Sequence, residues 1–374
     1  MRAAVLHGPG LLSMEERELS ALRPGWARVR ISTVAVCEDD LDAYRGTMEH
    51  QRYPVIPGRD AVGTIVEYHS PELERTQKQD GIIPFRPAGA GPGEGSLVAL
   101  LPENYIDRVF AGEQASEQSD ERNRCNRLPR FRTRGLPDRP AKTRLGHNID
   151  GALAEYAVVP IEQCVPVPEG VDTRDAVFLQ AGRRALYAVH RSKAAEGDYV
   201  AIIGAGDMGI IAAQLVRNAG GTPILVDTGE TRLDLARSMG FEHTINPFNA
   251  YAAEEIEWIT SGDMADVVID MTGRSDVASQ CPDFASEGGR IVYTRCQERD
   301  AFVSSRSLVL KELSIVGCQN CGAPPDAVFD ELASGRVRVD SLVSTHLPLD
   351  AAPLVIPSVV ENPDHYMRVL FGSA

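Results

Sequence analysis

The chain has 374 residues and a formal net charge of −15 at pH 7, so it is long enough for two domains that each bury a core. Such an acidic surface is repelled by nucleic acid and by anionic membranes, and we expect neither as a partner. No segment reaches the roughly 18 apolar residues of a membrane span, and the N-terminus lacks the apolar core of a signal peptide. Seven cysteines, an odd number in a long chain, favour reduced thiols over a disulfide framework. The sequence therefore predicts a cytoplasmic protein.

The N-terminal part of the chain is rich in short strand-like runs separated by glycine and proline, which predicts a β-rich domain. The expected strands are Ala3 to Leu6, Trp26 to Val36, Ala61 to Tyr68 and Ser96 to Leu100. Residues 85–95 have glycines spaced as in a phosphate loop, but no buried strand precedes them and Pro92 stands where a helix would begin, so we predict a surface loop. Residues 102–146 form a long segment without clear apolar periodicity, which is usually functional or mobile.

A glycine-rich turn between a predicted strand and a predicted helix is the most specific motif. Tyr199 to Ile203 is a short apolar run, as expected for a parallel strand buried on both faces. Gly204, Gly206 and Gly209 follow with the spacing G-x-G-x-x-G, which allows a tight turn and close approach of the backbone to a phosphate. A helix from Met208 to Asn218 would direct its free N–H groups, beginning with that of Met208, at a pyrophosphate. The motif predicts a dinucleotide-binding unit.

An acidic residue completes this unit and bears on the choice of cofactor. A second predicted strand, Thr222 to Val226, ends at Asp227, about 20 residues after the glycines, where a carboxylate would accept hydrogen bonds from both ribose hydroxyls. A 2′-phosphate about 4 Å from this carboxylate would be repelled by roughly 4 kcal/mol at an effective dielectric of about 20. NAD is therefore expected ahead of NADP. Arg232 either offsets part of this repulsion at the same edge or is a solvated helix arginine.

The second half of the chain alternates strand and helix patterns, which predicts a doubly wound parallel sheet and an α/β fold. The later strands are expected at Glu242 to Ile245, Val267 to Asp270, Arg290 to Tyr293 and Leu313 to Val316. With the two strands of the glycine-turn unit they give the six of a Rossmann domain. The last fifty or so residues return to strand character, at Val343 to Leu347 and Tyr366 to Phe371, and are expected to rejoin the first domain. We place the boundaries at 1–165, completed by 322–374, and at 166–321.

This order of domains resembles the medium-chain dehydrogenase/reductase superfamily, whose catalytic domain is GroES-like. Three segments carry the resemblance: VAVCEDDLDAYRG (34–46), YPVIPGRDAVGTIVE (53–67) and DGALAEYAVVP (150–160). The resemblance covers nearly the whole chain and is closest to the polyol, sugar and cyclitol branch that includes sorbitol and threonine dehydrogenases. It implies an NAD-linked enzyme that acts on a small-molecule substrate and commonly forms homo-oligomers.

In that branch the resemblance implies oxidation of a secondary alcohol with the help of a catalytic zinc ion. The positions that match the metal site are Cys37, Arg59, Asp60 and Gln180. An arginine remains protonated and has no lone pair to offer a metal, so these residues make a poor zinc site. The four-cysteine lobe that holds the family's structural zinc is replaced by a segment with a single cysteine, Cys125. We therefore expect a protein without bound metal.

Without zinc, other groups must stabilise the substrate oxygen and accept its proton. Arg59 is a candidate, because a guanidinium at the vacated histidine position could bind a developing alkoxide or a substrate carboxylate or phosphate. The alternative is that Arg59 pairs with Asp60 to fill the old metal pocket.

Asp39 is a second candidate, because it stands where the family carries a serine or threonine that relays the substrate proton. Partial burial would raise its pKa toward that of a general base, although it could equally be an acid that favours the start of a helix. Cys37 is expected to be a small buried residue left from the metal site; the alternative is a nucleophile.

Several further residues have weaker signals. Thr272 and Gly273 follow the fourth strand of the predicted Rossmann sheet, where family members contact the cofactor. Cys318 and Cys321 form a C-x-x-C that lacks the second half of a zinc site, so we expect both to be structural. His147, His346, Tyr44 and Tyr105 are expected to be ordinary structural residues.

Three functions follow from these observations. The first is an NAD-dependent dehydrogenase that oxidises a hydroxyl, or reduces the ketone, of a sugar, polyol, cyclitol or related metabolite without catalytic zinc. The second is a zinc-independent reductase of activated double bonds or quinones; such enzymes usually use NADPH, so Asp227 counts against it. The third is a catalytically inactive dinucleotide-binding protein.

Overall fold

The alternating strand and helix segments of the second half form one parallel sheet. The computed structural model describes residues 1–48, 50–69, 92–102, 144–295, 300–318 and 322–372. The strands of this sheet are β8 (Tyr199–Ile203), β9 (Thr222–Val226), β10 (His243–Ile245), β11 (Ala265–Asp270), β12 (Ala285–Tyr293) and β13 (Ser314–Gly317). They are parallel and lie in the order β10-β9-β8-β11-β12-β13. The strand order reverses between β8 and β11, and doubly wound folds bind ligands outside the carboxyl ends of the strands at such a point.

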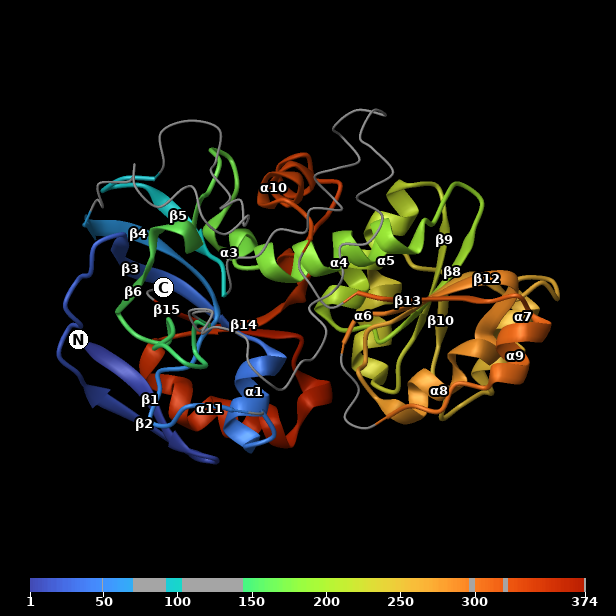
Figure 1. Cartoon of the computed structure of the whole chain (residues 1–374), viewed down its shortest axis with the longest axis horizontal. Helices are drawn as coiled ribbons and strands as arrows, with labels where there is room; N and C mark the ends of the chain where they lie inside the picture. The colour runs from blue at the N-terminus through green and yellow to red at the C-terminus, as the bar shows by residue number, and fades with distance from the viewer. Residues whose placement is uncertain (49, 70–91, 103–143, 296–299, 319–321, 373–374) are drawn as a thin grey trace, which may run out of the picture.

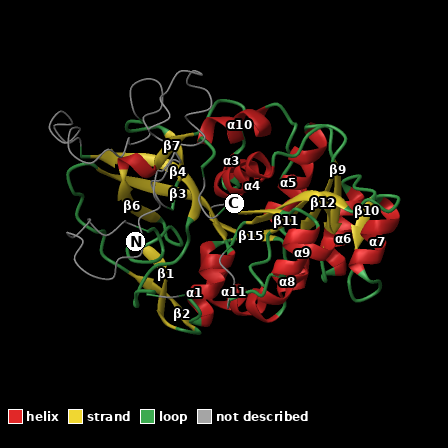
Figure 2. Cartoon of the chain, turned by 45° about the vertical axis from the view of Figure 1, so that its right-hand side comes forward, coloured by secondary structure: helices red, strands yellow, loops and turns green. Residues whose placement is uncertain are grey.

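Helices cover both faces of this sheet, as Figure 2 shows. Val200 and Ile202 pack into one hydrophobic cluster, and Ala201 and Ile203, which alternate with them along β8, pack into another. This alternation explains the continuous apolar run of the strand. The helices of the chain are α1 (Glu38–Arg45), α3 (Thr173–Ala176), α4 (Leu179–Ser192), α5 (Asp207–Asn218), α6 (Glu230–Ser238), α7 (Ala252–Ile259), α8 (Ser275–Phe284), α9 (Ser305–Leu310), α10 (Pro325–Ala333) and α11 (Ala352–Glu361).

The first lobe, which contains the N-terminal part of the chain, is built on an open β-sheet that C-terminal strands complete (Figure 1). Six of its seven strands have the order β14-β15-β3-β4-β5-β7, and the seventh strand, β6, pairs with β3. The first two strands of the chain form a separate antiparallel pair. The bounds are β1 (Arg2–Gly8), β2 (Leu11–Glu16), β3 (Trp26–Val36), β4 (Asp60–Tyr68), β5 (Leu97–Leu100), β6 (Tyr156–Pro160), β7 (Cys164–Pro166), β14 (Val343–Leu347) and β15 (Arg368–Gly372).

The structure confirms the predicted α/β fold, with a GroES-like lobe and a doubly wound Rossmann sheet. All the expected strands are present, and the C-terminal strands β14 and β15 rejoin the first lobe as expected. The strands β2 and β7 were missed, and β6 was found only as part of the 150–160 motif. The domain boundaries stay a prediction. The predicted loop at 85–95 and the long segment 102–146 fall largely outside the described residues. Among the described residues, no helix is long and apolar enough to cross a membrane.

One buried arginine, Arg368 of β15, joins the two lobes. Its Nη2 donates to Oδ2 of Asp60 at 2.6 Å, and its Nη1 lies 3.0 Å from Oδ2 of Asp207, the first residue of α5. Its guanidinium lies over the ring of Phe178, 5.3 Å from the centroid. Burial alone would lower the pKa of Arg368, but Asp207 and Asp60 more than offset this and raise it. A cation of the first lobe thus lies at the start of the dinucleotide helix of the second.

We expect Arg368→Met to destabilise the protein by about 3–5 kcal/mol, because the change leaves the buried carboxylate of Asp60 without its cation. Urea denaturation followed by circular dichroism measures the change in free energy of unfolding. The matched control is Arg338→Met, which removes an exposed ion pair with Asp340 and should cost less than about 0.5 kcal/mol. Equal stability of the two variants would show that the bridge is not needed to hold the lobes.

Candidate functional site

The glycine turn after β8 has the geometry that close packing of helix on strand requires. Gly204 has φ +104°, a conformation that residues with a side chain rarely adopt. A Cβ on Gly209 would lie 1.9 Å from the carbonyl oxygen of Gly204, so only glycine fits there. A Cβ on Gly206, the residue that precedes α5, would meet nothing within 4 Å, so the backbone is open to the crevice at that point. These are the three roles expected for a turn that receives a pyrophosphate.

The start of α5 differs from the expectation in one respect. The helix begins at Asp207, one residue before the predicted start. Oδ1 of Asp207 accepts the Met208 N–H at 2.7 Å, so the donor that we assigned to a pyrophosphate is bound by a side chain here. Oδ2 of the same carboxylate is bound by Arg368. The positive charge beside the turn therefore comes from Arg368, a residue that the sequence analysis missed.

Asp227 and Arg232 meet at the edge of the sheet where a ribose is expected. Oδ2 of Asp227 accepts the Ala205 N–H at 2.7 Å, and Oδ1 accepts the Gly229 N–H at 2.7 Å. Nη1 of Arg232 donates to the same carboxylate at 2.9 Å, and its Nη2 binds Asp364 of the C-terminal segment. The carboxylate is thus fixed in place next to the glycine turn.

Thr272 lies over the same turn from the neighbouring strand. Its amide and hydroxyl donate to Oδ1 of Asp270, the last residue of β11, at 2.8 and 2.7 Å. Its methyl group is 3.3 Å from the position of a Cβ on Gly204. Gly204, Gly206, Gly209, Asp227, Arg232 and Thr272 therefore line one edge of the parallel sheet. This arrangement fits a nicotinamide dinucleotide, whose pyrophosphate and ribose would lie along it.

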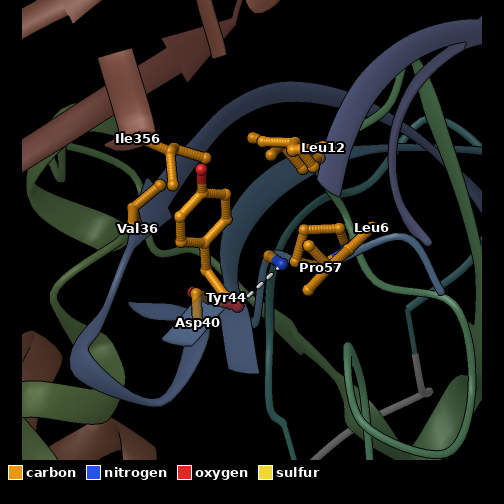
Figure 3. Close-up of a pocket in the computed structure, with 9 residues that line it drawn as sticks. Leu6, Leu12, Val36, Asp40, Tyr44, Pro57 and Ile356 are labelled. Atoms are coloured by element: carbon orange, nitrogen blue, oxygen red, sulfur yellow. Dashed lines mark hydrogen bonds between the residues drawn. The ribbon is translucent and has the colours of Figure 1, made fainter. Parts of the chain in front are cut away.

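The start of α1 contains a buried acid that the sequence analysis did not single out. Asp40 accepts hydrogen bonds from the backbone N–H and the thiol of Cys37, at 3.0 and 3.2 Å, and from the Gly58 N–H at 2.8 Å. It lies beside a small apolar pocket lined by Tyr44, Leu12 and neighbouring residues (Figure 3). Burial raises the pKa of Asp40 and, together with the nearby carboxylates, raises the pKa of Cys37 well above its usual value. Cys37 is therefore a protonated thiol that donates a hydrogen bond, and it is not poised as a nucleophile.

Arg59 and Asp39 form an ion pair at the interface between the lobes. The Arg59 side chain is buried, and its Nη1 binds Oδ2 of Asp39. Nη2 of Arg184, from α4, lies 3.7 Å from the same oxygen. Burial raises the pKa of Asp39, but Arg59 and Arg184 more than offset this, so the pKa is lowered. The expectation of a raised pKa was wrong, because it considered burial without the arginines that come from elsewhere in the chain.

The four positions that match the family's catalytic metal site are occupied in other ways. The Cys37 thiol is bound to Asp40, Arg59 binds Asp39, and Asp60 binds Arg368. Oε1 of Gln180 accepts from Arg183 at 3.4 Å. Within the described ranges, no group of three or more His, Cys, Asp or Glu residues could hold a metal ion. A guanidinium has no lone pair for a metal, so the donor set at these positions does not fit zinc.

Some of the remaining candidates lie outside the described residues. Cys318 is buried just after β13, whereas Cys321 and Tyr105 are not among the described residues. His147 is buried, and burial lowers the pKa of His346. Arg184 was missed although its signal was visible: it follows Arg183 in the first half of α4, four residues after the matched position Gln180.

Comparison with known proteins identifies the family of both lobes. Residues 23–169 match the sequence model of the alcohol dehydrogenase GroES-like domain, and residues 208–334 match that of the zinc-binding dehydrogenase domain. The L-galactonate-5-dehydrogenase of Escherichia coli K12 is 22% identical over 93% of this chain and 92% of its own length.

Two solved structures share the fold over the whole chain. A zinc-binding dehydrogenase of Sinorhizobium meliloti, solved with NADP, has a TM-score of 0.79 at 23% identity and is covered over 99% of its length. An alcohol dehydrogenase of Escherichia coli CFT073, solved with NADH, has a TM-score of 0.78 at 23% identity and is also covered over 99%. The chain belongs to the medium-chain dehydrogenase/reductase superfamily and is an NAD(P)-dependent oxidoreductase of the medium-chain type.

Proposed function

We propose that this protein transfers a hydride between NAD and a hydroxyl or ketone of a sugar, polyol, cyclitol or related metabolite, without a catalytic zinc ion. The observation that carries the proposal is the Arg59–Asp39 pair at the position of the family's metal site. Asp60, the next residue after Arg59, is joined through Arg368 to Asp207 at the dinucleotide turn. Relatives that oxidise hydroxyl groups, such as the L-galactonate dehydrogenase, support the substrate class.

In this mechanism the charge of Arg59 replaces the Lewis acid. When bound, NAD supplies the hydride acceptor for the oxidation. Arg59 is buried, so its guanidinium stabilises negative charge on the substrate oxygen more strongly than it would in water. Asp39 holds Arg59 in place and stays ionised, because its pKa is lowered. We assign Asp39 as a positioning residue, and the hydroxyl proton leaves to water at the partly exposed side of this carboxylate.

The test is alcohol oxidation by the protein after dialysis against a chelator. We expect turnover with NAD to be unaffected by the chelator, and the purified protein to hold far less than stoichiometric zinc by elemental analysis. Arg59→Met should lower kcat about a hundredfold, because one charged donor to the transition state is lost. Arg59→Lys should retain part of the activity, since the charge remains.

The control Arg338→Met should leave kcat unchanged, and NADH binding should confirm that each variant is folded. Stoichiometric zinc whose removal abolishes turnover would overturn the metal-free mechanism. NADPH-dependent reduction of enones or quinones without alcohol oxidation would favour the reductase function. Tight NADH binding without turnover on a panel of alcohols, ketones and enones would favour an inactive dinucleotide-binding protein.

The proposed preference for NAD follows from the charges at the ribose edge. One guanidinium, that of Arg232, is shared between the carboxylates of Asp227 and Asp364. A cofactor 2′-phosphate beside them would meet more negative than positive charge, which disfavours NADP.

We expect NADH to bind at least about tenfold more tightly than NADPH in fluorescence titrations. Asp227→Asn should reduce the ratio of the NADPH dissociation constant to the NADH dissociation constant, because one of the two negative charges is removed. The control is Asp326→Asn, an exposed acid of α10. A wild-type ratio near one, or a ratio that Asp227→Asn leaves unchanged, would contradict this assignment.

We further propose that the protein is a homo-oligomer that acts on small molecules and binds neither nucleic acid nor membranes. β13 is one of the two edge strands of the parallel sheet, and Ile315 on it is partly exposed. Phe302, Val309 and Leu310 of the preceding segment are also exposed. An edge strand with exposed apolar residues is suited to pair with a second copy. The cytoplasmic location stays a prediction.

We expect Ile315→Lys to convert the oligomer to a smaller species, because a charge is placed in the interface of both copies. Analytical ultracentrifugation measures the mass. The control Leu354→Lys places the same charge on an exposed apolar residue of α11 and should leave the mass unchanged. A monomeric wild type, or an Ile315→Lys variant of unchanged mass, would rule out this interface.

A further inference from the structure

The C-terminal segment of the first lobe contacts the dinucleotide site at two points. Arg368, at the start of β15, binds Asp207 at the start of α5. Asp364, four residues earlier in the chain, binds Nη2 of Arg232 in α6. The carbonyl oxygen of Pro363 lies 3.5 Å from the same nitrogen. One short segment of the first lobe thus approaches both the glycine turn and the edge of the sheet where a ribose is expected.

The two terminal nitrogens of Arg232 are divided between two acids from different lobes. Nη1 donates to Oδ1 and Oδ2 of Asp227, at 2.9 and 3.2 Å. Nη2 donates to Oδ1 of Asp364. The side chains of Asp227 and Arg232 are largely buried, whereas that of Asp364 is exposed. The guanidinium is therefore held between the ribose-edge acid and an acid of the other lobe.

The backbone at Gly229 shows how closely these three side chains gather. A Cβ on Gly229 would lie 3.2 Å from Oδ1 of Asp227, 3.2 Å from Oδ1 of Asp364 and 3.4 Å from Cζ of Arg232. Both carboxylates and the guanidinium therefore lie around the same point of the turn between β9 and α6. A 2′-phosphate on a ribose bound at Asp227 would meet Asp364 and Arg232 as well.

The other charged side chains of α6 are engaged with one another. Nη1 of Arg237 binds Glu230 and Asp234, at 2.7 and 2.6 Å, and its Nε donates to the hydroxyl of Thr244 at 2.8 Å. Glu230 also accepts from Nδ2 of Asn246 at 2.7 Å. Of the two arginines in α6, the one that reaches the ribose-edge acid is therefore the one that Asp364 binds.

We propose that Asp364 is a positioning residue for cofactor selection: it occupies Nη2 of Arg232, so that this guanidinium cannot bind a 2′-phosphate and NAD is preferred to NADP. A guanidinium binds phosphate best through paired N–H groups on one edge, and here each acid takes one of the two terminal nitrogens. Because Asp364 belongs to the first lobe, the selection operates only when the two lobes are together. The inference rests on the preference for NAD in the proposed function and assigns part of it to a residue of the opposite lobe.

The test is the change Asp364→Asn, with NADPH and NADH titrated by fluorescence at physiological ionic strength. We expect the dissociation constant of NADPH to fall about fivefold or more, because the released Nη2 can bind the 2′-phosphate, and that of NADH to change less than about twofold. Asp364→Glu keeps the carboxylate and should retain most of the discrimination. The matched control is Asp350→Asn, a similarly exposed acid that binds Arg2 within the first lobe, and it should bind both cofactors as the wild type does.

The same change in an Arg232→Gln background separates two explanations. Loss of a negative charge by itself would favour NADPH in either background. If Asp364 acts through Arg232, Asp364→Asn should change NADPH affinity less than about twofold once the guanidinium is gone. NADH binding by each variant verifies that its cofactor site is intact.

The outcomes separate this inference from the proposed preference for NAD. An unchanged NADPH affinity in Asp364→Asn, or an equal gain in the wild-type and Arg232→Gln backgrounds, overturns the role of Asp364 even if the wild type prefers NADH. A gain of the same size for NADH and NADPH also overturns it, because the effect would not depend on the 2′-phosphate. A gain for NADPH that requires Arg232, in a protein whose wild type binds both cofactors equally, supports the inference and overturns the proposed preference.

Discussion

The pairing of Arg368 with Asp60 and Asp207 is the interaction on which the arrangement of the site depends. A buried guanidinium is costly to desolvate, and two carboxylates from different lobes supply the compensation. Because Asp60 is bound to Arg368, the preceding residue Arg59 is directed to Asp39, where it meets Arg184 from α4. The Arg59–Asp39 pair and the dinucleotide turn are thereby linked through one side chain.

Arg59 stands where the resemblance to the family places a metal-binding histidine, and the neighbouring thiol of Cys37 keeps its proton. A zinc ion would hold the cysteine as a thiolate, because coordination deprotonates the thiol. Here burial and the carboxylates of Asp40, Asp60 and Asp39 raise the pKa of Cys37, and the thiol donates to Asp40. The charge of Arg59 lowers this pKa, but burial and the three carboxylates outweigh it. The four positions that match the family's metal site are thus joined to their neighbours by hydrogen bonds and ion pairs.

The sequence was sufficient where the determining contacts are local. The glycine turn, the helix after it and Asp227 follow from spacing alone, and the strands from runs of apolar residues, because neighbours in the chain determine these features. Short strands such as β7 have too few residues for a pattern. Arg368 could not be assigned, since its partner Asp60 lies 308 residues away along the chain. The same holds for the pKa of Asp39, whose direction is decided by arginines that only the tertiary fold brings close.

The ionised state of Asp39 has a consequence for the arrangement of the arginines around it. Arg59 and Arg184 would repel each other across the interface if Asp39 were absent, so this carboxylate holds the two guanidinium groups together. Arg184 is partly exposed, so salt screens its attraction to Asp39, whereas the pair between Asp39 and the buried Arg59 is screened much less. Of the two contacts, the one with Arg59 therefore persists at high ionic strength, and the contact between α4 and α1 through Arg184 is the one that weakens.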